Sequence, residues 1–353
     1  MIKLSRYLQL AVDRQASDLY FTANAPVMLR IEGEMVAVGR DPLTAEAVED
    51  LILGILTPQQ REEFATQREL DLATEAGGVG RFRANVYRQR GMTSMVMRYI
   101  PTAVPRLDDL QLPAVLKELA LLKRGLVLVV GPTGSGKTTT LAAMIRHRNE
   151  TASGHILSIE DPIEYVHANL RAVVSQREVG LDTESYERAL VSAMRESPDV
   201  VYLGEIRRRA TMDACIQLAN TGHLVLSTLH ANNAPQALQR IANFYPIDQR
   251  DQLYLDLSLL LRGIVAQRLV PGVGGRRAAA VGILLNTPYV SELILSRRIE
   301  EIPALMEQGG GQGMRTLDGA LLELYRKGLV SMENVLDNAD SRSSLRAKIS
   351  FGG

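Results

Sequence analysis

Short runs of aliphatic residues recur along the last two thirds of the chain and alternate with amphipathic stretches. The runs are Leu126–Val130, Ile156–Ile159, Val200–Leu203 and Leu224–Ser227. Leu126–Val130 is unbroken, and the others carry one serine or tyrosine each. Short runs rich in β-branched and aliphatic residues are typical of buried parallel strands. The stretches 185–196 and 210–219 have helical periodicity instead. This alternation predicts a parallel sheet with helices on both faces and ligand chemistry at the carboxyl ends of its strands.

The first hundred residues have a different pattern. An amphipathic helix is expected at the start, because apolar residues from Leu4 to Val12 recur at helical spacing. Alternating or β-rich segments at 17–21, 28–31, 69–74, 80–90 and 93–100 predict strands, and 44–53 and 58–64 predict helices. Together they predict a small α+β domain over residues 1–100.

The rest of the chain is expected to form a second domain. Pro101 and Pro105 bracket a predicted linker, residues 101–113, since proline restricts its predecessor to extended conformations. The second domain then covers 114–353, and a helix is predicted over 112–122. We expect one long helical segment over Asp248–Arg268, followed by shorter helices, with Gly309–Gly313 as a flexible connector.

A glycine-rich turn follows the aliphatic run that ends at Val130. It reads Gly131, Pro132, Thr133, Gly134, Ser135, Gly136, Lys137, Thr138, Thr139. Glycines let backbone N–H groups converge on a phosphate at the positive end of a helix, Lys137 would reach the β and γ oxygens, and the Thr138 hydroxyl could bind Mg²⁺. The alternative is a glycine-rich turn that contains a lysine by chance. It would have to account for the spacing, the preceding strand and the following helix together. The turn therefore predicts an ATP site with Mg²⁺.

Composition limits the classes of partner and compartment. Of 353 residues, 46% are hydrophobic, and 40 Lys and Arg balance 40 Asp and Glu. This balance gives no field that favours nucleic acid, so no nucleic-acid partner is expected. Cys215 is the single cysteine, which excludes an intramolecular disulfide or a cysteine-cluster zinc site and fits a reducing compartment. No apolar stretch is long enough to span a membrane, which predicts a cytoplasmic protein whose membrane contact is peripheral.

Carboxylates follow two of the predicted strands. Glu160, Asp161 and Glu164 come just after the strand 156–159, where a carboxylate could orient the attacking water or accept its proton. Solvated acids in a turn formed by Asp161-Pro162 are the alternative. Glu205 comes just after the strand 200–203 in a Walker-B-like position, where an acid binds Mg²⁺ directly or through water.

Histidines and arginines supply further candidates. His223 and His230 bracket the strand 224–227, and His230 at its end could donate to a phosphate oxygen. Arg81, Arg83, Arg88, Arg90 and Arg98 cluster on predicted strands of the first domain. These arginines could form one solvated face, or in a ring some could reach a neighbouring subunit's nucleotide.

Four segments together resemble the type IV pilus and type II secretion ATPases, specifically the PilT/PilU retraction branch. They are Gly131–Thr138, an "Asp box" at Ile159–Tyr165, Gly204–Arg207 and a "His box" at Thr221–His230. All four stand in the order and spacing of that family. The resemblance reaches Ser17–Leu19, Gly80–Arg83 and Ala266–Leu269, and so covers most of the chain.

The resemblance implies a PAS-like α+β N-terminal domain followed by a RecA-like P-loop ATPase domain. It also implies a cytoplasmic homohexamer, associated peripherally with the inner membrane through a pilus platform protein, that hydrolyses ATP to drive pilus retraction and twitching motility. Glu164 is implied to be the catalytic carboxylate, with Glu160 as the alternative, and Glu205 to be the Walker B acid. Arg81, Arg83 and Arg98, and in the second domain Arg195 and Arg207, are candidates for contact with nucleotide.

Departures from PilT resemble the PilU group, the accessory retraction ATPases. Glu205 is followed by Ile206-Arg207-Arg208-Arg209 where PilT sequences read Met-Arg-Asp, and Tyr20 replaces a histidine. A PilT-type ATPase is accordingly an expected partner. Three alternatives are an accessory ring subunit that binds nucleotide with little turnover, a pilus extension or type II secretion ATPase, and a RecA-like nucleic-acid motor. The four-cysteine zinc site usual in extension ATPases is missing.

Overall fold

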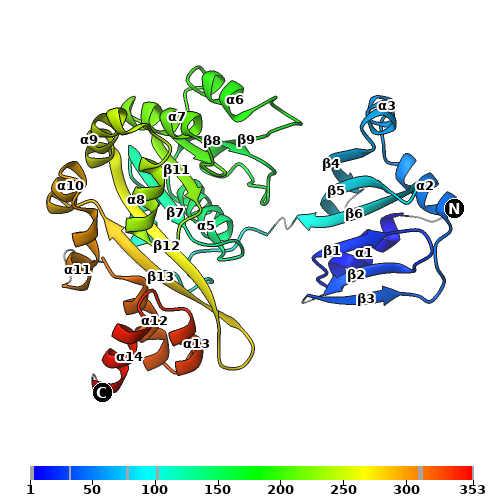
Figure 1. Ribbon diagram of the computed structural model, residues 1–353. Coiled ribbons are helices and arrows are strands. Elements are labelled where there is room, and N and C mark those ends of the chain that lie inside the picture. The colour runs from blue at the N-terminus through cyan, green and yellow to red at the C-terminus, as the bar shows by residue number, and fades with distance from the viewer. Residues whose placement is uncertain (1–3, 32, 77–78, 101–102, 309–312, 352–353) are drawn as a thin grey trace. The chain divides into compact units, whose positions relative to one another are not determined.

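The computed structural model describes residues 4–31, 33–76, 79–100, 103–308 and 313–351 (Figure 1). This part of the chain divides into two compact units. The first comprises the chain up to Ala103 together with 164–166, and the second comprises 104–163 and the chain from His167 onward. Pro101 of the predicted linker and 309–312 of the predicted glycine connector lie outside the described residues.

The first unit is built on a six-stranded antiparallel sheet with the order β3-β2-β1-β6-β5-β4. Its strands are β1 (Asp18–Phe21), β2 (Val27–Ile31), β3 (Glu34–Val38), β4 (Glu69–Ala76), β5 (Gly80–Gln89) and β6 (Met92–Ile100). Its helices are α1 (Leu4–Asp13), α2 (Ala45–Leu53) and α3 (Pro58–Gln67). Every element predicted here from the pattern is present, and only β3 was not predicted.

A seven-stranded sheet forms the centre of the second unit, in the order β13-β12-β7-β11-β10-β8-β9. Its strands are β7 (Gly125–Val130), β8 (Gly154–Glu160), β9 (Ala172–Glu178), β10 (Val200–Leu203), β11 (Leu224–Leu229), β12 (Leu261–Pro271) and β13 (Arg277–Leu285). All neighbours are parallel except β13, which runs antiparallel to β12. The carboxyl ends of six strands therefore meet at one edge.

Both faces of this sheet are covered by helices. Alternate residues of β7 enter two different cores: Leu126, Leu128 and Val130 enter one, and Val127 and Val129 enter the other. The second core includes side chains of α4 (Val115–Ala120) and α5 (Lys137–Thr151), and the first is closed by α6 (Tyr186–Ala193), α7 (Arg209–Asn220), α8 (Ala234–Ala242), α9 (Arg250–Leu260) and α10 (Pro288–Leu295). Cys215 of α7 is fully buried, and burial raises the pKa of its thiol.

Two predictions for the later part of the chain were wrong. The helix expected over 248–268 ends at Leu260, and the chain continues as strand β12. Strand β13 stands where shorter helices were expected. Apolar residues such as Ile264 and Val265 are buried between β7 and β13, so tertiary burial decides the conformation of a run whose periodicity fits either element.

The chain ends in short helices, which are α11 (Ile302–Glu307), α12 (Leu317–Arg326), α13 (Met332–Asp337) and α14 (Arg342–Phe351). α11 adds Ile302 and Met306 to the first core. Leu321, Val335 and Leu345 pack with Val270 of β12 and Ala280 of β13 in a separate small core. None of the helices in the described ranges is long and apolar enough to cross a bilayer.

Candidate nucleotide-binding site

The glycine-rich turn joins β7 to α5 and lies against β12. Gly134 and Gly136 have left-handed backbones, with φ of 77° and 86°. A Cβ on Gly131 would lie 2.4 Å from the carbonyl oxygen of Gln267, and one on Gly136 would lie 2.8 Å from Gln267 Nε2. The turn therefore needs glycine both for its conformation and for its close approach to β12.

Polar groups of the turn and of the first turn of α5 point to an anionic ligand. Lys137 is buried, and its Nζ donates to the carbonyl oxygens of Gly131 and Pro132, at 3.0 Å each. Ser135 Oγ is buried and has no hydrogen-bond partner among the described residues. Thr138 is half-buried at the start of α5. An orphaned hydroxyl and a buried ammonium at a helix N-terminus fit the oxygens of a phosphate group.

Strand register brings the predicted catalytic segments to the same edge as this turn. Val130 pairs with Leu229, and Leu203 pairs with both Ser227 and Ile159. The residues that end or follow these strands are Gly131, His230, Glu205 and Glu160. The sequence prediction that chemistry gathers at the carboxyl ends of β7, β11, β10 and β8 agrees with this order.

Glu205 is held between two basic side chains. Arg207 Nε donates to its Oε2 at 2.8 Å, and His230 Nε2 lies 3.0 Å from its Oε1. The hydrogen bond between Arg207 and Glu205 is the main cause of the raised pKa of Arg207. The side chain of Glu205 is only 16% exposed, whereas that of Arg207 is 65% exposed. Arg207 therefore contacts the carboxylate of Glu205 from the side that faces solvent.

Glu160 and Glu164 differ in environment. Glu160, the last residue of β8, is buried and accepts hydrogen bonds from Ser158 Oγ at 2.7 Å and Gln176 Nε2 at 3.2 Å. Glu164 is exposed, on the loop that follows β8. The two candidates for the catalytic carboxylate therefore divide into one that is fixed and one that is open to solvent.

Tyr186 is a residue of this region that the sequence did not single out. A Cβ on Gly204 would lie 2.9 Å from its hydroxyl. Burial raises the pKa of Tyr186, and the negative charge of Asp161 adds to the shift. No motif marks this tyrosine, because it comes from α6 and reaches the acids only through the fold.

Some candidates lie elsewhere. His223 precedes β11 at the opposite edge of the sheet, where Thr221 Oγ1 and the carbonyl oxygen of Leu218 each lie 3.0 Å from its Nδ1. In the first unit, Arg98 Nε donates to the buried Asp18 at 2.8 Å, and Arg83 lies 3.5 Å from Asp71. Arg81 is half-buried on β5.

Cavities open on both sides of the glycine-rich turn. One of about 600 Å³ is lined by residues that include Gly136, Thr139, Thr140, Gln267 and Arg276. Another of about 440 Å³ is lined by residues that include Gly131, Pro132, His230 and, from α8, Gln236 and Gln239. Within the described ranges no group of three or more His, Cys, Asp or Glu side chains could hold a metal ion. A magnesium ion here would depend on one or two protein oxygens and the oxygens of a phosphate ligand, its usual mode.

Comparison with known proteins shows the family of this chain. The family model described as "Type II/IV secretion system protein" matches residues 2–287. The chain is 47% identical to the type IV pilus ATPase PilU of Pseudomonas aeruginosa over 99% of its own length and 92% of that protein. It is 39% identical to the retraction ATPase PilT of the same organism, over 95% and 98% of the two chains.

A solved structure agrees with the fold. The crystal structure of the pilus retraction motor PilT with bound ADP superimposes with a TM-score of 0.93 at 37% identity, covering 98% of this chain and 99% of that one. This match confirms the predicted α+β N-terminal domain followed by a RecA-like ATPase domain. The chain belongs to the type II/IV secretion ATPase family, among its pilus retraction ATPases, and shares more of its sequence with this PilU than with this PilT.

Proposed function

We propose that this chain is an ATP-hydrolysing motor for type IV pilus retraction that works as a homohexameric ring. The glycine-rich turn carries the proposal, since Lys137 and the unpartnered Ser135 Oγ lie where a phosphate would bind. The ADP-bound PilT structure supports it, because its fold covers nearly the whole of this chain. The cavity of about 600 Å³ beside Gly136 and Gln267 is suited to the nucleoside end of ATP.

The roles of the residues follow from their places. Mg²⁺·ATP supplies the phosphoanhydride bond and a metal that neutralises developing negative charge. Lys137 would bind the β- and γ-phosphate oxygens, and Thr138 with Glu205 would hold the metal. Glu160 is already committed to Ser158 and Gln176, so we assign the orientation of the attacking water to Glu164. His230 would hold Glu205 in place and donate to a phosphate oxygen.

Positive charge at the γ-phosphate is proposed to come from a neighbouring subunit. Arg81, Arg83 and Arg98 of the first unit are the candidates, in the role of arginine fingers. The ring is proposed to act in the cytoplasm, at the inner membrane, with a pilus platform protein and a PilT-type ATPase as partners. No nucleic-acid partner is proposed.

Purified protein tests the proposal directly. We expect Mg²⁺-dependent ATP hydrolysis that Lys137→Ala and Glu205→Ala abolish and that Glu164→Gln lowers while nucleotide binding persists. EDTA should abolish turnover. Hydrolysis at the wild-type rate in both Lys137→Ala and Glu205→Ala would contradict the assignment of the site.

An accessory ring subunit with little turnover is the second candidate, and one contact favours it. Arg207 Nε occupies Oε2 of Glu205 at 2.8 Å, so a cation competes with magnesium for the Walker B carboxylate. Arg208 and Arg209 add further positive charge directly after it. In this version the ring binds nucleotide and couples a partner PilT motor to the platform.

A further inference from the structure

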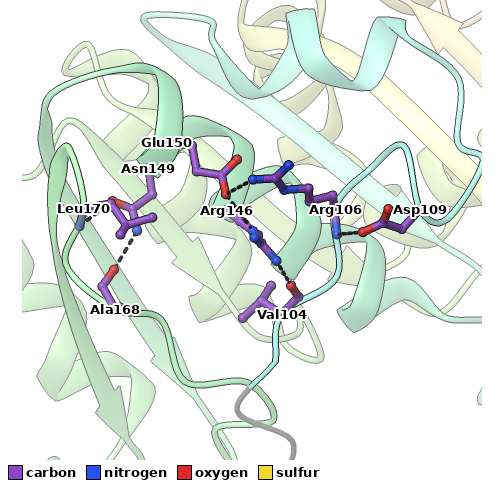
Figure 2. Close-up of polar contacts among 8 residues, drawn as sticks. All are labelled: Val104, Arg106, Asp109, Arg146, Asn149, Glu150, Ala168 and Leu170. Carbon is purple, nitrogen blue, oxygen red and sulfur yellow. Dashed lines mark hydrogen bonds and ion pairs between the residues drawn. The ribbon is translucent and has the colours of Figure 1, made fainter.

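The C-terminal end of α5 contacts two segments that lie far apart in the sequence (Figure 2). α5 begins at Lys137 in the proposed phosphate site, and its last two turns carry Arg146, Asn149 and Glu150. We call these three residues the α5 clasp. One segment that it holds is 104–106, where the second unit begins, and the other is 168–172, which leads into β9.

Asn149 uses its whole side chain to hold the second segment. It is 2% exposed, and its Nδ2 donates to the Ala168 carbonyl oxygen at 2.7 Å (Figure 2). Its Oδ1 accepts hydrogen bonds from the N–H groups of Leu170 and Ala172, at 3.2 Å each. The backbone carbonyl oxygen of Asn149 lies in the last turn of α5, where helix carbonyls lack a partner within the helix. It accepts a hydrogen bond from the N–H of Arg171 at 3.0 Å.

Arg146 and Glu150 hold the first segment. Arg146 donates through Nη1 to the Val104 carbonyl oxygen and through Nε to Glu150 Oε1 at 2.9 Å. Arg106 approaches the same carboxylate oxygen at 3.4 Å, as Figure 2 shows. The hydrogen bond from Arg146 lowers the pKa of Glu150, so this carboxylate stays charged. Burial lowers the pKa of His167, the residue just before the second segment, and the charge of Arg146 adds to this shift.

The second segment leads into β9, a strand that is hydrogen-bonded to the Asp box. Gln176 of β9 donates to Glu160 and accepts from the N–H of His167 at 2.7 Å. Glu178 Oε2, at the end of β9, accepts from the N–H of Ile163 at 3.2 Å. The chain on both sides of Glu164 is thus hydrogen-bonded to β9, and the first residue of β9 is hydrogen-bonded to Asn149.

We propose that the α5 clasp positions the Asp box for ATP hydrolysis, with Asn149 as its principal positioning residue. The inference rests on the proposed function, since it needs hydrolysis at the turn where α5 starts. One rigid helix joins the phosphate site to the base of the loop that carries Glu164. Loss of Asn149 releases Ala168, Leu170 and Ala172 while leaving the phosphate site intact.

A purely structural role for the clasp makes a different prediction, and Arg148 provides the matched control. It lies on the same helix beside Asn149, is buried, and donates to the carbonyl oxygens of Ala120 and Leu122 at 3.3 and 2.9 Å. These bonds tie α5 to the end of α4 and not to either held segment. Arg148→Met should lower the melting temperature without changing kcat.

The test compares Asn149→Ala with this control in the full chain. We expect Asn149→Ala to lower kcat about 10-fold while Kd for ADP changes less than about twofold, as for a lost positioning contact. Arg146→Gln, whose parent side chain is partly exposed, should fold readily and lower kcat about threefold. An unchanged kcat in Asn149→Ala, or in Arg146→Gln if the former does not fold, would overturn the proposal.

A double-mutant cycle identifies the route. In a Glu164→Gln background the further loss caused by Asn149→Ala should shrink to less than about twofold, because the loop no longer presents a carboxylate. Full additivity would overturn a route through Glu164. Failure of the proposed function gives a separate result, namely hydrolysis that survives Lys137→Ala.

Discussion

Two atoms of Gln267 in β12 lie so close to the glycine-rich turn that Gly131 and Gly136 leave no room for a side chain. Gln267 is 3% exposed and receives a hydrogen bond from Thr140 Oγ1 at 2.7 Å. The side-chain amide of Gln267 is therefore fixed directly against Gly136. The backbone carbonyl oxygen of Gln267 lies against Gly131. The sequence marks the glycines of this turn, but only the fold shows that Gln267 is the reason for two of them.

A pair of alanine substitutions separates backbone strain from this contact. Gly134 and Gly136 both have positive φ, so alanine at either position costs about 1–2 kcal/mol of stability. Only at Gly136 would the new Cβ meet an atom within 4 Å, Gln267 Nε2 at 2.8 Å. Urea unfolding should show Gly136→Ala less stable than Gly134→Ala by about 1 kcal/mol, through loss of the Thr140 hydrogen bond. Equal losses would contradict the proposed contact.

His167 predicts a pH dependence of stability. Burial lowers its pKa to about 4, and the charge of Arg146 adds to the shift. Between pH 6.5 and 4 the unfolded chain binds a proton that the folded chain does not, so stability falls as the pH falls. Over this window wild type should lose up to about 3 kcal/mol relative to His167→Gln, measured by urea unfolding at each pH. A pH-independent difference between the two proteins would contradict it.

At the scale of elements, the aliphatic runs predict the strands that carry the site. β7, β8, β10 and β11 each follow from a short run rich in aliphatic residues, and their order along the sheet aligns the four motifs. β9, β12 and β13 were not predicted, and for β12 and β13 there is a physical reason. Leu261 follows α9 without a helix-stopping residue, and Arg277–Leu285 is rich in alanine, so only pairing with β7 and with each other makes them strands.

Candidate site residues divide along the same line. Lys137 stands in the glycine-rich motif, and Glu160, Glu205 and His230 lie at or near the ends of predicted strands, so the local sequence is enough to find them. Tyr186, Gln176 and Asn149 reach the region from other elements and stand in no motif. The choice between Glu160 and Glu164 needs their difference in burial, which the spacing of the Asp box does not contain.

The C-terminal helices depend on one buried carboxylate. Asp318 of α12 is 9% exposed and accepts from the N–H groups of Asp340 and Ser341 at 2.7 and 3.0 Å, just before α14. Asp318→Ala leaves both donors without that acceptor and should cost about 2 kcal/mol in urea unfolding. Asp337→Ala is the control, because its pair with Arg342 is exposed and should contribute less than about 1 kcal/mol. Equal losses would contradict the role of Asp318.

At the scale of the whole molecule, the chain belongs to a family of secretion and pilus ATPases and has no net charge. A run of three arginines, 207 to 209, follows Glu205, the proposed Walker B acid. The balance of 40 basic and 40 acidic residues gives no reason to expect a nucleic-acid track. The chain is 47% identical to a PilU over nearly its full length. This similarity is compatible with both proposed roles in pilus retraction, motor and accessory subunit. Their difference lies in whether this chain's own hydrolysis is needed.

A chromosomal Lys137→Ala copy distinguishes these roles in cells that keep their PilT-type ATPase. Lys137 is buried in the proposed phosphate site, so its loss should abolish hydrolysis by this chain while leaving its surfaces for ring assembly unchanged. If hydrolysis here drives the fibre, retraction frequency and force should fall to the level of a deletion strain. An accessory subunit should instead support near-normal retraction with Lys137→Ala, and the purified wild-type protein should turn over ATP far more slowly than its partner. The two roles are distinguished by measuring the retraction of labelled pili together with ATP turnover by the isolated protein. The motor role requires that Lys137→Ala abolish both retraction and turnover.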